Sequence, residues 1–194
     1  MHTIEPYYKW RDLYSAENDD RSPFYGREYD EFTFTKKVYN YFIHPQWDDF
    51  GSNTLYAKII YVDYSMHYAV IELIGEWNDC LHNDIMFFMR NVIEPMMSND
   101  IKFFILACEN VMNFHGSDDC YYEEWSEEVS GEGGWISFIN IFDHVKQEME
   151  SVNLQFHANL GPDLNDVHWR GRKPNHLFEE VERRMNNSVR QLGY

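Results

Sequence analysis

Apolar residues are arranged in two different ways along this chain, and the two arrangements predict its strands and helices. Uninterrupted runs that are rich in β-branched and aromatic residues are typical of strands buried in a sheet. Four such runs lie at residues 54–64, 69–77, 101–109 and 135–141. The first two are joined by Ser65–Tyr68, a length that predicts a β-hairpin. A short apolar segment, Leu154–Ala158, predicts a further strand.

Between these runs the apolar residues recur every three or four positions, which is the spacing of one face of a helix. The predicted helical segments are 81–96, 122–129, 145–152 and 177–192. Asn78, Asp79 and Asn83 are suited to capping the first helix, and Ser117 or Asp118 to capping the second. Alternating strands and helices predict parallel crossover units. We therefore expect an α/β fold, in which helices pack on a mixed sheet made of an N-terminal antiparallel hairpin plus parallel βα units.

The first fifty residues lack both patterns. They are polar and rich in tyrosine, and only Phe32–Ile43 has the composition of a strand. We expect one domain with two parts: an aromatic N-terminal arm with one strand at residues 1–53, and an α/β core at residues 54–194. The aromatic residues expected to hold the arm on the core are Tyr7, Tyr8, Trp10, Phe24 and Tyr25.

Composition and charge narrow the classes of partner. Apolar residues make up 44% of the chain, which favours a folded domain, while 33 acidic and 16 basic residues give a formal net charge of -17. This balance argues against nucleic acid and against anionic membranes, which both attract basic surfaces. The three cysteines form no metal-binding pair, and no signal peptide or membrane-spanning run is recognisable, so a cytoplasmic location is expected.

The segment Asn113–Trp125, "NFHGSDDCYYEEW", concentrates chemically active side chains. Most of it is explained by an amphipathic helix that begins near Asp118, because Tyr122 and Trp125 fall on one face and acids cover the others. Nine acids and no lysine or arginine lie between Phe103 and His144. They are Glu109, Asp118, Asp119, Glu123, Glu124, Glu127, Glu128, Glu132 and Asp143. Acids four residues apart on a helix repel each other, so a cation, a basic partner or the chain's own basic "RGRK" segment could neutralise them.

The place of this segment also suggests a site. It follows a predicted central strand, and ligands of open α/β sheets collect at the carboxyl ends of strands. The residues expected to bind there are His115, Ser117, Asp118, Asp119, Glu124, His144 and Glu148. No cofactor is predicted from a motif. A divalent metal is one alternative, with His115, Asp119, His144 and Glu148 as candidate ligands, and His144 and Glu148 share a helix face.

The sequence also bears on two further chemistries, nucleophilic catalysis and anion binding. Nucleophilic catalysis is not favoured, because Ser117 lacks a nucleophile elbow and Cys120 lies beside acids that oppose thiolate formation. Arg170 and Arg172 lie in the polar loop before the last helix, where they are suited to binding a phosphate or a carboxylate.

The order of elements resembles that of STAS domains, the anti-sigma-factor antagonist-like family. The resemblance covers about residues 54–152, with "ELIGEWND" closing the hairpin and "ILACENVMNFHGSDD" running from a central strand into a serine-bearing loop. His-Gly-Ser-Asp stands where the family has Asp-Ser-Ser-Gly, and Ser117 falls near the serine that is phosphorylated in regulatory members. The resemblance implies a partner-binding module without catalysis of its own.

The function that we expect from the sequence is a non-catalytic regulatory or protein-interaction module that binds a protein partner or associates with itself. The high aromatic content, 18%, suits an interface. The alternative is a metal- or small-molecule-binding enzyme with its site at the carboxyl ends of the strands, around His115 and His144.

Overall fold

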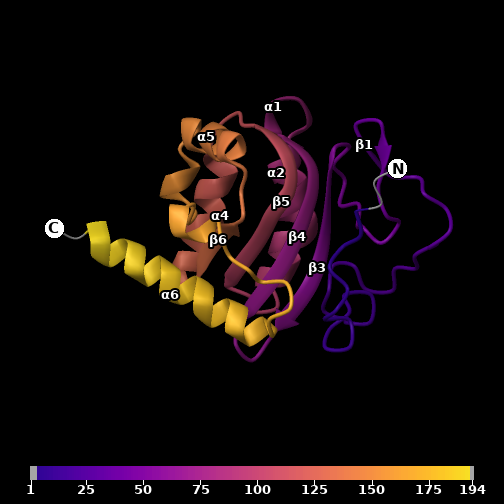
Figure 1. Ribbon diagram of the computed structural model, residues 1–194, viewed down its shortest axis with the longest axis horizontal. Helices are drawn as coiled ribbons and strands as arrows, with labels where there is room; N and C mark the ends of the chain where they lie inside the picture. Colours follow the sequence, from indigo (N-terminus) through magenta and orange to yellow (C-terminus); the bar gives the residue numbers. More distant parts are fainter. Residues whose placement is uncertain (1–3, 193–194) are drawn as a thin grey trace.

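A four-stranded mixed sheet forms the centre of the protein. The computed structural model describes residues 4–192, and the side chains of residues 4–187. The sheet order is β3-β4-β5-β6, with β3 (Leu55–Asp63), β4 (Tyr68–Asn78), β5 (Phe103–His115) and β6 (Trp135–Ile139). β3 pairs antiparallel with β4, whereas β4, β5 and β6 are parallel, so the predicted α/β class and mixed sheet are confirmed (Figure 1).

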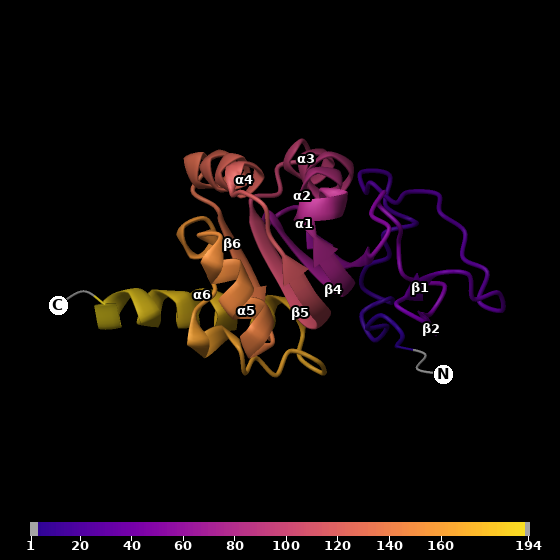
Figure 2. The same ribbon diagram turned by 90° about the horizontal axis from the view of Figure 1, so that it is seen from above.

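Five α-helices and a π-helical turn cover one face of the sheet. They are α1 (Asp79–His82), α2 (Asp84–Phe88), the π-helical turn η1 (Met89–Ile93), α3 (Glu94–Met97), α4 (Cys120–Gly131) and α5 (Asp143–Ser151). The last helix, α6 (Pro174–Leu192), lies on the other face (Figures 1 and 2). Of its predicted apolar face, Val189 and Leu192 lie outside the residues whose side chains are described. Within residues 4–192, no helix has the length and apolar character needed to cross a bilayer.

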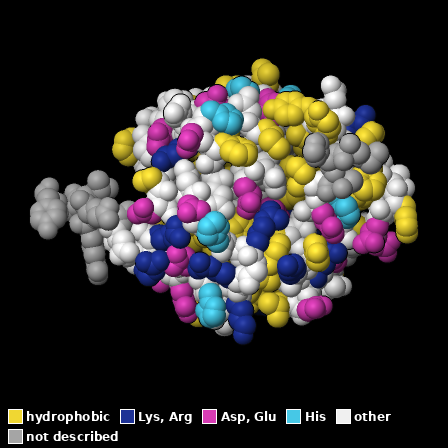
Figure 3. All heavy atoms as spheres, viewed as in Figure 1, with side chains coloured by type: hydrophobic (Ala, Val, Ile, Leu, Met, Phe, Trp, Pro, Cys, Tyr) yellow, Lys and Arg dark blue, Asp and Glu magenta, His cyan; other side chains and the backbone are white. Residues whose placement is uncertain are grey.

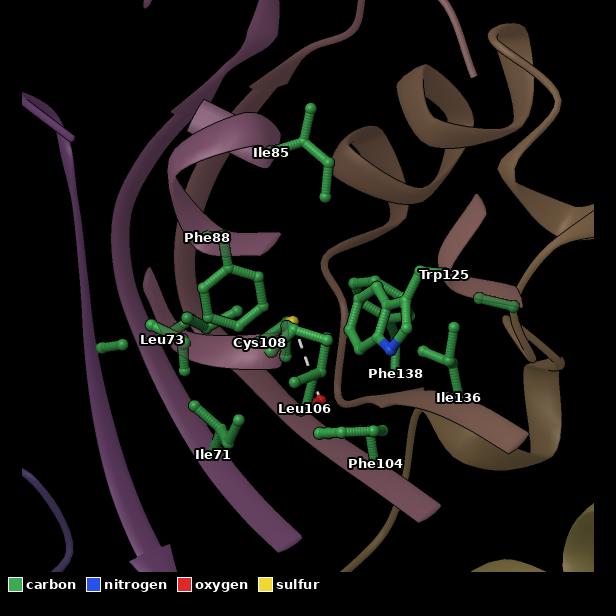
Figure 4. Close-up of a cluster of buried hydrophobic side chains, with 14 of the residues drawn as sticks. Ile71, Leu73, Ile85, Phe88, Phe104, Leu106, Cys108, Trp125, Ile136 and Phe138 are labelled. Carbon is green, nitrogen blue, oxygen red and sulfur yellow. Dashed lines mark hydrogen bonds between the residues drawn. The ribbon is translucent and has the colours of Figure 1, made fainter. Parts of the chain in front are cut away.

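The two faces of the sheet follow from the alternation of side chains along each strand. In β4, Ala69, Ile71 and Leu73 contact the helix layer, whereas Tyr68 and Val70 belong to the second core beneath α6. Figure 4 shows the first core, where Ile71, Leu73 and Phe104 meet side chains of the helix layer such as Phe88 and Trp125.

An aromatic row anchors α6 on the second face. Tyr68, Phe103 and Trp135 begin three neighbouring strands and are in register with one another. The Phe178 ring of α6 stacks on Tyr68 and on Trp135, with ring centres 4.6 and 5.5 Å apart. The fixed register of the sheet therefore builds the surface on which the helix docks.

The N-terminal arm is irregular. Its predicted strand at Phe32–Ile43 is reduced to a small hairpin of β1 (Lys37–Val38) and β2 (Tyr41–Phe42). Three of the five predicted anchors are buried, namely Tyr7, Trp10 and Phe24. The prediction is wrong for Tyr8 and Tyr25, whose side chains are more than half exposed.

A buried ion-pair network holds the arm against the edge strand β3. The Asp48 carboxylate accepts hydrogen bonds from the Tyr29 hydroxyl (2.6 Å), Arg27 Nη1 (3.1 Å) and Lys58 Nζ (3.2 Å). Asp48 and Ala57 also form an antiparallel bridge. The arm therefore satisfies backbone groups that a bare edge strand would expose.

Three local predictions need correction. β5 continues to His115, so "NFH" belongs to the strand and not to the following loop. Residues 154–156 form a 3-10 turn, η2 (Leu154–Phe156), instead of the predicted strand, and a second 3-10 turn, η3 (Pro162–Leu164), follows. The cap of α4 is Asp119 and not Ser117 or Asp118, although the Asp118 carboxylate accepts a bond from Cys120 N–H at 3.2 Å.

Candidate functional site

The carboxyl ends of β4 and β5 carry a small polar cluster around His115. Its Nε2 atom lies 2.8 Å from the Asn113 amide nitrogen and 3.4 Å from Glu76 Oε1. The Glu76 carboxylate also accepts a bond from the Asn78 amide (3.1 Å). The β1–β2 hairpin lies beside β4, because Val38 packs in one cluster with Ile74. Burial and the neighbouring Glu76 raise the pKa of Tyr39 in this hairpin. The predicted edge therefore holds His115 and Glu76 together.

The serine and the two aspartates after this strand do not join that cluster. Ser117 and Asp118 are exposed, and within residues 4–187 no histidine contacts the Ser117 hydroxyl. The Asp119 carboxylate is paired with His157 Nε2 at 3.1 Å, and this bond lowers the pKa of Asp119. The hydrogen bond and charge of Asp118 raise the pKa of the Cys120 thiol, which opposes thiolate formation.

His144 and Glu148 share a face of α5, as their spacing predicted, but both face the backbone of β5. His144 Nε2 lies 2.9 Å from the Met112 carbonyl oxygen, and the Glu148 carboxylate accepts a bond from Phe114 N–H at 3.2 Å. The four candidate metal ligands thus have separate partners. Among the described residues, no group of three or more His, Cys, Asp or Glu side chains is placed to hold a metal ion.

Two buried aspartates at the end of β4 were not recognised as a pair from the sequence. Asn78 caps α1 as predicted, because its side chain accepts a bond from Leu81 N–H. Asp79 accepts bonds from Trp77 Nε1–H (3.0 Å), Ile85 N–H (2.8 Å) and the Tyr122 hydroxyl (2.6 Å). Burial raises the pKa of Asp79 to about 6, against the effect of these donors. This carboxyl ties α4 to the start of the helix layer.

The second buried aspartate, Asp84, fixes the loop before β3. It accepts bonds from Asn78 N–H (2.8 Å) and from the Thr54 hydroxyl (3.2 Å). Burial also raises the pKa of Asp84, and each of the two aspartates lies in a region where the sequence showed only helix-capping residues. Their joint burial had no local signal, because it depends on contacts with distant segments, such as Tyr122 of α4 for Asp79 and Thr54 for Asp84.

Arg170 holds a carboxylate, as predicted for the basic loop, but the carboxylates belong to the chain itself. Its guanidinium group donates a hydrogen bond to Glu72, which is fully buried in the middle of β4, and lies 3.6 Å from Glu109. The Arg172 side chain is exposed, and its carbonyl oxygen accepts a bond from Trp10 Nε1–H at 2.9 Å. Of the nine acids between residues 103 and 144, Arg170 therefore reaches Glu109.

Three other acids of that stretch, Glu124, Glu128 and Glu132, line a groove between α3 and α4. The groove has a volume of about 880 Å³, and its apolar part consists of the half-buried Met97 and the buried side chains of Ile101 and Val129. Its carboxylates are Glu94, Asp100, Glu124, Glu128 and Glu132, and the other charged or titratable residues are His67 and Lys102. Lys102 Nζ donates to the backbone oxygen of Glu132 and not to a carboxylate. None of these five carboxylates is in an ion pair with another residue of the described range 4–187.

The acidic surface continues along α4. Cys120, Glu123, Glu124, Glu127 and Glu128 line a shallower hollow of about 670 Å³ next to the groove. The face that carries α6 is different, because basic and acidic side chains are interspersed on it (Figure 3). Glu124 is thus the one predicted site residue that lines the groove between α3 and α4.

Comparison with known proteins shows a structural likeness. No protein-family model matches the chain, and no curated protein matches it. The fold is similar to the crystal structure of a protein described as a putative anti-sigma factor antagonist from Thermotoga maritima. The TM-score is 0.43 at 15% identity, over 65% of this chain and 92% of that one. This is the class of protein that the sequence resemblance named, but at this TM-score and identity no activity or partner carries over.

Proposed function

We propose that the protein is a non-catalytic interaction module that binds a protein partner through the acidic groove between α3 and α4. The observation that carries this proposal is the groove itself, with five carboxylates around an apolar part. A partner that brings lysine or arginine together with apolar side chains matches both properties.

The spacing of the groove carboxylates makes them repel one another. Glu124, Glu128 and Glu132 follow one another at intervals of four residues and are all exposed. Their mutual repulsion costs a few tenths of a kcal/mol for each pair, and no basic residue of α4 offsets it. A cationic partner recovers this cost on binding, and complementary charge also raises the rate of association.

The direct test is binding of a synthetic amphipathic peptide with lysines on one face and leucines on the other, measured by calorimetry and mapped by NMR shifts. The variant E124Q/E128Q/E132Q removes three charges from the groove, and D12N/D20N/E28Q removes three exposed charges from the arm. We expect the groove variant to weaken binding about tenfold and the arm variant to change it less than about threefold. Equal losses in both variants, or shifts spread over the whole surface, would reject the groove as the docking site.

A further inference from the structure

A single buried carboxyl group joins three distant parts of the chain. Glu72 lies in the middle of β4 on the face away from α4, and its side chain is fully buried. It accepts a hydrogen bond from the backbone N–H of Tyr7 in the arm at 2.8 Å. It also accepts one from Arg170, which lies 98 residues further along the chain. The arm and the loop before α6 therefore meet on one side chain of the central sheet.

The arm segment and the loop are also bonded to each other. The backbone N–H of Gly171 donates to the Tyr7 hydroxyl at 2.9 Å, and Trp10 Nε1–H donates to the Arg172 carbonyl at 2.9 Å. The rings of Tyr7 and Trp169 make an edge contact with centres 4.9 Å apart. Displacing the Tyr7–Trp10 segment would thus open the whole assembly and admit water to Glu72.

The charged groups around Glu72 do not offset the cost of burying its carboxylate. From β5, Glu109 contributes a second carboxylate and the Asn110 amide lies 3.5 Å away, while the loop contributes Arg170 alone. Lys58 of β3 is directly opposite Glu72 in the strand register, but its ammonium group contacts Asp48, Tyr29 and Glu17. From the arm, the backbone N–H of Tyr7 is the donor. One cation therefore serves two carboxylates, of which Glu72 is fully buried whereas Glu109, like Arg170 itself, is partly exposed.

Burial is the dominant influence on this carboxyl group. It raises the pKa of Glu72 from 4.5 to about 7, although Arg170 and the Tyr7 N–H act in the opposite direction. Displacement of the arm returns water to the carboxyl and moves its pKa back toward the ordinary value. The closed arrangement therefore binds the proton more tightly than the open one, and by linkage the proton favours closure.

We propose that Glu72 couples attachment of the Tyr7–Trp10 segment to uptake of a proton. The segment is held most tightly when the carboxyl is protonated, and it detaches more readily once the carboxyl is ionised. The surface that this exposes is the sheet face around Ile60 and Tyr61, opposite the groove on α4. The inference does not depend on the proposed docking function.

Hydrogen exchange of the arm tests this coupling. Protection of the amides of residues 5–12, corrected for intrinsic exchange rates, should fall by up to about tenfold per pH unit between about pH 5 and pH 7. Protection of β5 residues 104–108 should remain high over the same range, which separates detachment of the arm from global unfolding. A flat profile for residues 5–12 in a protein that stays folded would overturn the proposal.

Two variants identify the group responsible. E72Q should abolish the pH slope, whatever its absolute level of protection, whereas E76Q makes the same substitution further along β4 and should keep the wild-type slope. A slope that persists in E72Q would reject Glu72 as the titrating group. If E72Q does not fold, the variant R170Q provides the test. Loss of the guanidinium group should extend the pH slope of the protection of residues 5–12 above pH 7. An unchanged protection profile would count against the coupling.

Discussion

The carboxylates of this protein fall into two groups that differ in burial and in bonding. Asp48, Glu72 and Asp79 are buried, and each accepts bonds from at least two donors in other segments. Glu124 and Glu128 on α4 are exposed and line an open groove. Removing a charge from water is costly unless it is paired, whereas an exposed charge is stabilised by solvent. The first group therefore holds the fold, whereas the second is open to solvent.

The largest effect should come from breaking the buried Asp48 network. D48A removes the acceptor of Arg27, Tyr29 and Lys58, and Lys58 is only 6% exposed. We expect the free energy of unfolding to fall by about 3–5 kcal/mol, because a buried ammonium group loses its nearest carboxylate and keeps only Glu17, at 3.8 Å. Urea denaturation measures this, with E124A as the exposed counterpart, expected within about 0.5 kcal/mol of wild type. A loss below about 1 kcal/mol in D48A would remove the distinction between the groups.

The second-largest effect is a dependence of the free energy of unfolding on pH. The pKa of Asp79 is raised from 3.8 to about 6, mainly by burial, so the folded state binds this proton more tightly than the unfolded state. The resulting stability is fully present below about pH 4 and is lost as pH rises through about 6. We expect unfolding free energies to fall by on the order of 3 kcal/mol from Asp79 over this window.

The variant D79N should remove the share of the pH dependence that comes from Asp79, leaving the share of Glu72, whose raised pKa acts in the same direction. D118N neutralises an exposed aspartate and should keep the wild-type profile. Urea denaturation at a series of pH values from 4 to 8 measures both variants. Identical profiles for D79N and wild type would contradict the assignment.

A smaller effect is expected from the donor to Asp79. Y122F removes a buried hydroxyl that lies 2.6 Å from the carboxylate and should cost about 1–3 kcal/mol. The neighbouring Tyr121 is half-buried, which makes Y121F a matched control with an expected change below about 0.5 kcal/mol. Thermal denaturation of Y122F and Y121F measures the two losses of stability. Equal losses in both variants would show that the hydrogen bond from Tyr122 to Asp79 does not contribute to stability.

The smallest effect has the opposite sign. E124Q relieves the repulsion between Glu124 and Glu128, four residues apart on α4, and should stabilise the protein by a few tenths of a kcal/mol. Chemical denaturation at low salt detects this gain, which should shrink at high salt because exposed charges are screened. A destabilised E124Q variant would show that this carboxylate has an intramolecular partner after all.

Local pattern predicted much of the fold. The continuous apolar runs became β3, β4, β5 and β6, and the helical spacing of Tyr122, Trp125 and Val129 became the buried face of α4. Leu154–Ala158 was predicted wrongly, because a five-residue segment with apolar residues at alternate positions is compatible with a strand or a turn, and contacts with the core decide between them. His144 and Glu148 share a face as expected, but β5 backbone groups occupy both.

The sequence by itself determined the α/β order of elements and the acidic face of α4, because both depend on residues close together in the chain. Only the tertiary structure decided which carboxylates are buried and which cations reach them. Glu72 could have paired with Lys58 across the hairpin, yet its partner is Arg170, from the loop before α6. Periodicity records the local environment of a residue, whereas burial and ion pairing depend on segments that meet only when the chain has folded.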